Sequence, residues 1–309
     1  MGIIRFVFSK KGLGMVNQYL KDKESVSKKD FQPHFFEASS IPFYEAIFRK
    51  YGREFKLISD EEFLKDPDPK SINIPFDVSA EAFLYNEVWD PPLPLDGRPL
   101  IDVLGDKYVV YKIVRGIQGI RQPLTLALKG HADLKRGVEE IRTSKIVLKP
   151  RFFGYEARNV LLVNRARLEN ISQDERLNFS EYIMQEYLED IIWPPEEWRF
   201  HFIGRKLCRV MKITDKNNWS GVFKQENVLF ENVPAEFMMQ AEKVVKNLIK
   251  DLNNRDNFTI DFLRTKDGLV FLEANIGTLG SIYVQTEEDA TFVEPIFVEL
   301  FRHLDKMNG

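Results

Sequence analysis

Residues 259–275 read TIDFLRTKDGLVFLEAN, and this stretch decides the fold. Two apolar runs flank Lys266-Asp267-Gly268, which predicts two β-strands joined by a tight hairpin turn. Asp261 lies in the first strand, while Glu273 and Asn275 are two residues apart in the second and share a face. A carboxylate inside an apolar run is costly unless it has a partner. The pattern therefore indicates a hard-cation site suited to Mg²⁺ and phosphates, with solvated strand residues as the alternative.

Upstream of the hairpin, three predicted strands end in or carry charged residues. The strand over 145–149 ends in Lys149, which can reach a phosphate as a point charge. The strand over 182–186 ends in Glu186, and its backbone and the following acids can hold a nucleoside. Strands over 198–203 and 206–213 form a basic hairpin at Gly204. Each signal also has a plainer explanation, since charged residues at strand ends are commonly just solvated.

The first third of the chain has the opening of an α/β domain. A strand over 3–8 precedes Gly12, Gly14 and a predicted helix. The densest Pro/Gly cluster, WDPPLPLDGRP at 89–99, predicts a linker, so we expect domains at 1–100 and 101–309. In the second domain, helices are predicted over 234–252 and 292–304 from their apolar stripes.

Composition excludes several classes of protein. Over 309 residues the formal net charge is -3, so no overall basic field exists to attract nucleic acid or anionic lipid, and we expect neither partner. The apolar start of the chain is too short for a signal-peptide core or a membrane span. Cys208 is the single cysteine, which excludes an intramolecular disulfide and fits a reducing, cytoplasmic location.

The order of these motifs resembles the ATP-grasp superfamily, in particular the branch of glutathione synthetase, D-alanine–D-alanine ligase and the ligases that add glutamate to ribosomal proteins. The resemblance covers about 105–290 and is carried by Lys107, GIRQPLT at 119–125, Lys149-Pro150, Gln185-Glu186, Glu197-Trp198-Arg199 and Asp261…Glu273-Ala274-Asn275. It implies an α/β (α+β) fold in which two subdomains, about 105–190 and 191–309, clasp ATP. A smaller N-terminal α/β domain precedes them.

The resemblance also implies a role for each matching residue. The nucleotide phosphates would contact two lysines, Lys107 and Lys149. Adenine would bind the hinge Glu186, Tyr187 and Leu188, and the ribose would bind Glu189 or Asp190. Two Mg²⁺ ions, with Mn²⁺ as a substitute, would bind Asp261, Glu273 and Asn275. The transferred phosphoryl group would be stabilised by Arg199 and Lys212.

The activity implied is an ATP-dependent carboxylate–amine or carboxylate–thiol ligase that works through an acyl phosphate and releases ADP and phosphate. Its substrates would be small-molecule or peptide carboxylates and amines, and a homodimer stays open. Two rivals remain: a small-molecule kinase of the same superfamily and a non-catalytic ATP-binding protein. The chain departs from the pattern in its glycine-poor loop at 151–156, in Glu197 where aspartate is usual, and in 214–227, which leaves the acceptor undetermined.

Overall fold

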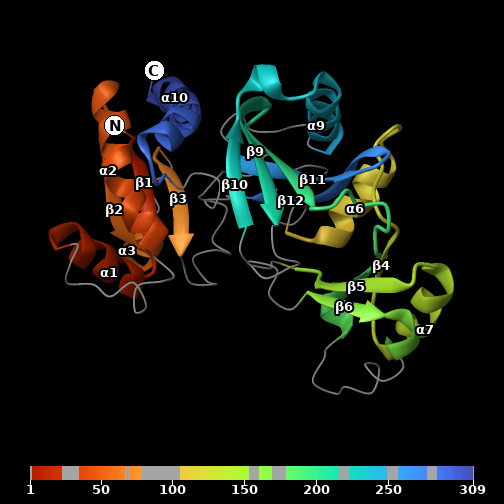
Figure 1. Ribbon diagram of the computed structural model, residues 1–309. Helices are drawn as coiled ribbons and strands as arrows, with labels where there is room; N and C mark the ends of the chain where they lie inside the picture. The colour runs from red at the N-terminus through yellow and green to blue at the C-terminus, as the bar shows by residue number, and fades with distance from the viewer. Residues whose placement is uncertain are drawn as a thin grey trace.

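The computed structural model describes residues 2–22, 35–66, 68, 70–77, 105–152, 160–168, 179–215, 223–248, 257–276 and 284–308. The strands in these ranges form three sheets, of three, four and five strands (Figure 1). The predicted linker at 89–99 lies outside the described residues, so the domain boundary stays a prediction. No helix in the described ranges is long and apolar enough to cross a membrane.

The N-terminal part is a parallel sheet covered by helices, as the opening of the chain predicts. Its strands are β1 (Ile4–Phe8), β2 (Phe55–Ser59) and β3 (Ile72–Asp77), in the order β2-β1-β3. The sheet packs its aromatic residues against helix α2, as in the stacked pair Phe6 and Tyr44 at 5.3 Å between ring centroids. The helices are α1 (Lys10–Lys21), α2 (Phe35–Lys50) and α3 (Asp60–Lys65).

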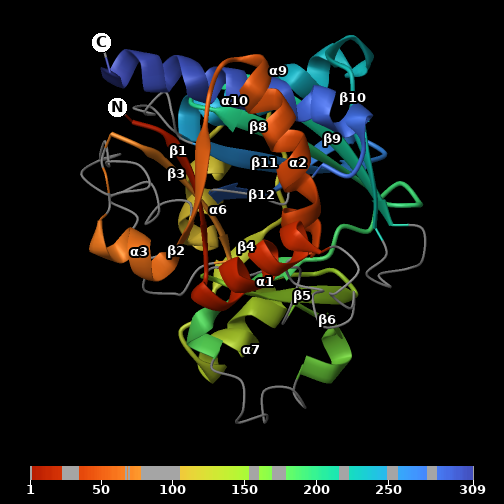
Figure 2. The ribbon, with the colours of Figure 1, turned by 90° about the vertical axis from the view of Figure 1, so that its left-hand side faces the viewer.

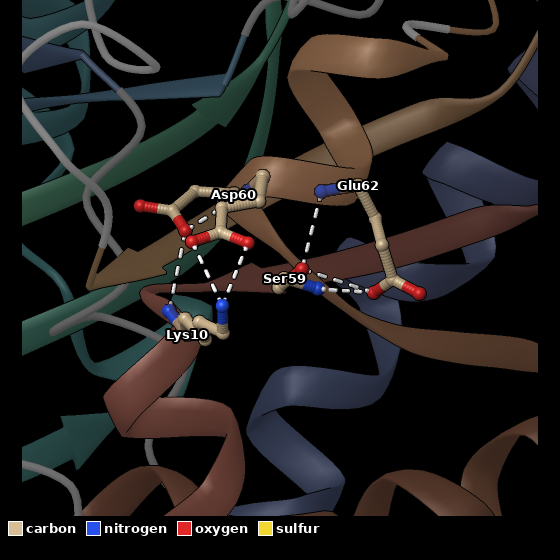
Figure 3. A network of polar contacts seen from close by, with 5 residues as sticks. Lys10, Ser59, Asp60 and Glu62 are labelled. Atoms are coloured by element: carbon tan, nitrogen blue, oxygen red, sulfur yellow. Dashed lines mark hydrogen bonds and ion pairs between the residues drawn. The ribbon is translucent and has the colours of Figure 1, made fainter.

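Local sequence starts α3 at the residue where β2 ends. The Ser59 hydroxyl accepts a hydrogen bond from the Glu62 backbone N–H at 3.1 Å, and the Glu62 carboxylate accepts one from the Ser59 N–H at 2.8 Å (Figure 3). This reciprocal pair is a capping box, which satisfies two backbone donors. The next residue, Asp60, accepts a hydrogen bond from the Lys10 backbone N–H at 3.2 Å, which joins α3 to the start of α1.

The four-stranded sheet is antiparallel and lies below the five-stranded sheet in Figure 1. Helix α6 lies between the two sheets in both ribbon views, which places its side chains within reach of each (Figures 1 and 2). The elements of this part are β4 (Thr125–Ala127), β5 (Lys145–Pro150), β6 (Leu161–Asn164) and β7 (Tyr182–Glu186), in the order β4-β7-β5-β6, with α6 (Lys107–Arg115), α7 (His131–Glu140) and the 3₁₀ turns η1 (Arg165–Arg167) and η2 (Phe179–Glu181).

The five-stranded sheet is antiparallel and has one apolar face. That face packs on α9 and α6 through aromatic contacts such as Trp198–Phe237 at 5.3 Å and Phe271–Tyr111 at 5.8 Å between ring centroids. The opposite face carries the polar residues described below. Its elements are β8 (Glu196–Ile203), β9 (Lys206–Asp215), β10 (Phe223–Val228), β11 (Asn257–Thr265), β12 (Gly268–Ile276), the 3₁₀ turn η3 (Phe230–Asn232) and α9 (Ala235–Leu248), with strand order β10-β9-β8-β11-β12.

The last helix, α10 (Glu287–Asn308), returns to the N-terminal part of the chain. It lies beside α2 in both ribbon views, and Phe297 contacts Tyr44 and Phe48 with ring centroids 5.2 and 5.1 Å apart (Figure 2). The same apolar cluster includes Ile203 and Cys208 from the five-stranded sheet. One core therefore joins the two ends of the chain to the middle of it.

Candidate active site

The polar face of the five-stranded sheet brings the predicted metal residues together. Asp261 on β11 pairs with Glu273 on β12 and with Arg199 on β8, and directly opposed residues of antiparallel strands point to the same face. Asn275 follows two residues after Glu273 and shares that face. The hairpin predicted from the sequence is confirmed, and its turn holds Gly268 at a φ of 111°.

Hydrogen bonds connect these side chains into one network. The Arg199 guanidinium donates to both oxygens of Asp261 at 2.9 Å and to Glu197 at 3.2 Å. The Asn275 amide donates to Asp261 at 3.1 Å and to Glu273 at 3.0 Å. Because Asp261 is 1% exposed, its charge depends on these partners rather than on water.

Two lysines from other elements lie close enough to Glu273 to interact with it electrostatically. Lys149 stands near the end of β5, and its ammonium donates to the Tyr111 hydroxyl on α6 at 3.2 Å. Lys107 is the first residue of α6 and is buried. Glu273 acts electrostatically on both lysines, so Lys107 and Lys149 lie near the same carboxylate.

The charged side chains around Asp261 shift one another's pKa values. Burial, together with the neighbouring carboxylate of Asp261, raises the pKa of Glu197 to about 7. Burial also raises the pKa of Asp261, against the opposing effect of Arg199. Glu273 differs: burial acts to raise its pKa, but Lys149 and Lys107 outweigh that and lower it. The site thus balances three carboxylates against three cationic side chains.

The donor set of this group fits a hard cation. In the described ranges no cluster of three or more His, Cys, Asp or Glu could hold a metal, so the candidate is two carboxylates with one amide. Carboxylate and amide oxygens are the donors that Mg²⁺ takes in proteins. The Asn275 amide now donates to both carboxylates, and the same group can offer its oxygen to a cation. Asp261, Glu273 and Asn275 are therefore the residues that would hold Mg²⁺.

The predicted nucleotide hinge connects the two sheets. Glu186 ends β7 and is fixed there, because its carboxylate accepts from the Leu124 backbone N–H at 2.8 Å. Leu188 packs with Leu263 and Val270 of the hairpin. The acids that follow have protein partners: Glu189 accepts from the Ser144 hydroxyl at 2.9 Å, and Asp190 pairs with Arg121 at 2.6 Å. The Tyr187 ring lies under the Lys145 ammonium, 5.4 Å from its centroid.

Unlike Arg199, Lys212 does not join the group around Asp261. It pairs with Trp198 across β8 and β9, and Trp198 packs on α9, so Lys212 points to the face opposite Arg199. Its ammonium lies 3.5 Å from Glu226 on β10. Lys212 lines a cavity of about 510 Å³ near the β10 edge, together with Trp198, Glu226, Asn227 and Asp289 among others.

Sequence reasoning missed two contacts that support the site. Tyr111 bonds Lys149 and donates to the Leu272 carbonyl, which ties α6 to β12; its position four residues after Lys107, on the same helix face, could have indicated it. Asp106 takes a bidentate contact from Arg151 at 2.9 and 2.6 Å, which fixes the start of α6 against the end of β5. Both contacts help to hold the two lysines in place.

With this geometry established, comparison with known proteins identifies the fold. No protein-family model and no curated protein sequence matches the chain. Solved structures do, over nearly their whole length. D-cycloserine synthetase DcsG has a TM-score of 0.65 at 16% identity, covering 98% of this chain and 100% of that one. D-alanine–D-alanine ligase from Bacillus anthracis with ATP has 0.59 at 14%, covering 99% of each.

A third similar structure is that of an ATP-grasp ligase. The ATP-grasp ligase PsnB with minimal precursor, Mg and ADP has a TM-score of 0.54 at 13% identity and covers 96% of both chains. Such likenesses establish the fold, and the chain has the ATP-grasp fold, as its motif order predicts. The α/β architecture expected from the sequence is confirmed.

Proposed function

We propose that this chain is an ATP-dependent ligase that joins a carboxylate to an amine, or to a thiol, through an acyl phosphate. A substrate carboxylate oxygen attacks the γ-phosphorus of ATP and ADP leaves. The amine nitrogen then attacks the acyl carbon, phosphate leaves, and the nitrogen loses a proton. The observation that carries the proposal is the convergence of Lys107, Lys149 and Arg199 on the carboxylates of Asp261 and Glu273.

Each charged residue then has a task that follows from its position. Lys107 and Lys149 neutralise phosphate charge, and Arg199 stabilises the phosphoryl group in transfer. Mg²⁺ held by Asp261, Glu273 and Asn275, two ions or Mn²⁺ in their place, would supply further positive charge to the phosphates. Lys212 has no part in this arrangement, because its side chain points to the opposite face of the sheet.

The hinge and the substrates complete the proposal. Adenine would lie at Glu186, Tyr187 and Leu188, where β7 leads toward the five-stranded sheet. The ribose would bind Glu189 or Asp190, once the carboxylate has left its present partner, Ser144 or Arg121. The similar structures include a D-cycloserine synthetase, a D-alanine–D-alanine ligase and an ATP-grasp ligase in complex with a minimal precursor. Small-molecule or peptide carboxylates and amines are accordingly the substrates we propose.

Thermal unfolding tests the nucleotide site directly. Ligand at a hundred times its Kd stabilises a protein by about 2.7 kcal/mol, which raises the midpoint by a few degrees. We expect MgATP to produce this rise in the wild type and in Glu242→Gln, an exposed control on α9, but not in Glu273→Gln. EDTA should abolish it. A rise that is the same with and without metal, or in all three proteins, would contradict the site.

Chemical trapping separates ligase from kinase. With MgATP, a pool of carboxylic acids and hydroxylamine, an acyl phosphate yields a hydroxamate that iron(III) detects. ADP release without hydroxamate, on addition of an alcohol pool, would indicate the kinase. Binding of MgATP with neither product would indicate the non-catalytic protein.

A further inference from the structure

Further polar side chains lie on the face of the five-stranded sheet that carries Asp261, Glu273 and Asn275. His201 on β8 pairs with Arg209 on β9 and with Thr259 on β11, so these three side chains lie on the same face as Arg199 and Asp261. His201 and Thr259 are 0% exposed and Arg209 is 3% exposed. Arg209 is the charged member of this extension.

Arg209 is held by a neutral group. Its Nε donates to the Asn227 amide oxygen at 2.6 Å, and within the described residues its buried Nη1 has no hydrogen-bond partner and its guanidinium has no ion pair. Asp289, whose charge acts on Arg209, is already committed: one oxygen accepts from Asn227 at 2.9 Å and the other from the Thr286 hydroxyl at 2.9 Å.

A buried arginine without an anionic partner favours the binding of an anion. Burying a guanidinium without an anionic partner costs free energy, and its planar donor set matches a carboxylate. Burial lowers the pKa of Arg209 to about 10, in the direction expected for a cation lacking its counter-ion. The Asn227 contact fixes the orientation of the guanidinium and leaves Nη1 as the donor for a ligand.

The distance between Arg209 and Arg199 sets the length of a ligand that contacts both. Arg199 pairs with Met211 and His201 with Arg209, so the two arginines are diagonal neighbours across β8 and β9. Diagonal neighbours on one face are about 7–8 Å apart, and each side chain can bend toward or away from the other. A small molecule with two functional ends spans this distance.

We propose that Arg209 binds a substrate carboxylate that does not react, so that one of the two substrates is a dicarboxylate or an amino acid. The inference rests on the proposed ligase function, because that function places the reacting carboxylate beside Arg199. In the first case Arg209 holds the far end of the acid that is phosphorylated. In the second it holds the carboxylate of the amine that attacks. Either way Arg209 is a determinant of specificity.

Binding of simple carboxylates tests this without knowledge of the natural substrate. The probes are succinate and glutarate as dicarboxylates, alanine and glutamate as amino acids, and succinamate and alaninamide as their matched amides. Midpoints of thermal unfolding are measured with MgADP and without nucleotide. We expect at least one dicarboxylate or amino acid to raise the unfolding midpoint, whereas its matched amide should not raise it. The class of probe that binds then identifies the class of the substrate.

Two variants assign the effect to Arg209. Arg209→Met should lose the response to the carboxylate, keep the response to MgATP, and be about as stable as the wild type without ligand, because an unpaired buried charge is removed. Arg205→Met, an exposed arginine in the β8–β9 turn, should respond like the wild type. If Arg209→Met does not fold, Arg209→Lys decides: its carboxylate binding should be at least tenfold weaker, because lysine lacks the planar fork.

The contrary results are distinct. If no probe shifts the wild type while MgATP does, or if Arg209→Lys binds the carboxylate as well as the wild type, Arg209 is a structural residue and the inference fails. If MgATP produces no shift, the proposed function fails instead, and the nucleotide-free measurements still report on Arg209.

Discussion

Asp261 shows how a single residue depends on its neighbours in this site. It is 1% exposed and accepts two hydrogen bonds from Arg199 at 2.9 Å. Its pKa is raised by burial even with that partner, so the site keeps a carboxylate in an environment that disfavours the charge. This cost supports the cation-binding role that we propose for Asp261.

Removal of the Asp261 charge should destabilise the folded chain. In Asp261→Asn the partly buried Arg199 loses its bidentate partner and retains Glu197, so we expect the free energy of unfolding to fall by about 2 kcal/mol. Denaturant unfolding measures the change. Asp267→Asn, at the exposed tip of the same hairpin with 79% of its side chain accessible, should change it by less than about 0.5 kcal/mol. Equal stability of the two variants would contradict the role of the pair.

At the same scale, local sequence patterns group some of the candidate site residues but do not fix the direction of every side chain. Asp261, Glu273 and Asn275 could be grouped because a hairpin and a period of two place them on one face. Lys212 could not be placed, because whether it shares a face with Arg199 depends on the register of β8 with β9. The partners of Arg209 and Tyr111 lie on other segments, and no local pattern shows which groups they contact.

At the scale of the element, the β11–β12 hairpin depends on its turn. Gly268 has a φ of 111°, a conformation that side-chain-bearing residues adopt only with strain. The turn sets the register in which Asp261 opposes Glu273, and a shift of that register would separate the metal residues. The site is thus positioned by a glycine that does not touch it.

Two glycine substitutions should have opposite effects. Gly268→Ala should destabilise the chain by about 1–2 kcal/mol, because alanine resists a positive φ. Gly14→Ala, at an exposed position inside α1 with no atom within 4 Å of the added carbon, should stabilise it by about 0.5–1 kcal/mol. Denaturant midpoints report both signs. An unchanged or raised midpoint in Gly268→Ala would show that the turn is not under this constraint.

At the scale of the whole molecule, α10 joins regions that are far apart in the sequence. Phe297 is fully buried between the rings of Phe6, Tyr44 and Phe48, and Arg53 pairs with Asp305 at 2.5 Å. The N-terminal sheet therefore completes its core with the last helix of the chain (Figure 2). Asp289, at the start of that helix, also reaches the polar face of the five-stranded sheet through Asn227.

Loss of one α10 side chain should accordingly affect the chain as a whole. We expect Phe297→Ala to lower the free energy of unfolding by about 3–5 kcal/mol. The buried thiol of Cys208, in the same cluster, should then react faster with a thiol reagent. Met239→Ala, 65% exposed on α9, is the control and should change neither quantity appreciably. Thiol labelling at the wild-type rate in Phe297→Ala would show that α10 and the sheet open independently.

The sequence by itself determined the type of most elements, the hairpin and the residues that could bind a cation and phosphates. These follow from local signals: alternation along a strand, turn residues, capping residues and apolar stripes. Only the tertiary structure decided that lysines from α6 and β5 lie near Glu273 of β12, that Lys212 points away, and that α10 belongs with the N-terminal core. The physical reason is that register and packing are set by contacts between distant segments, whose energies no single segment contains.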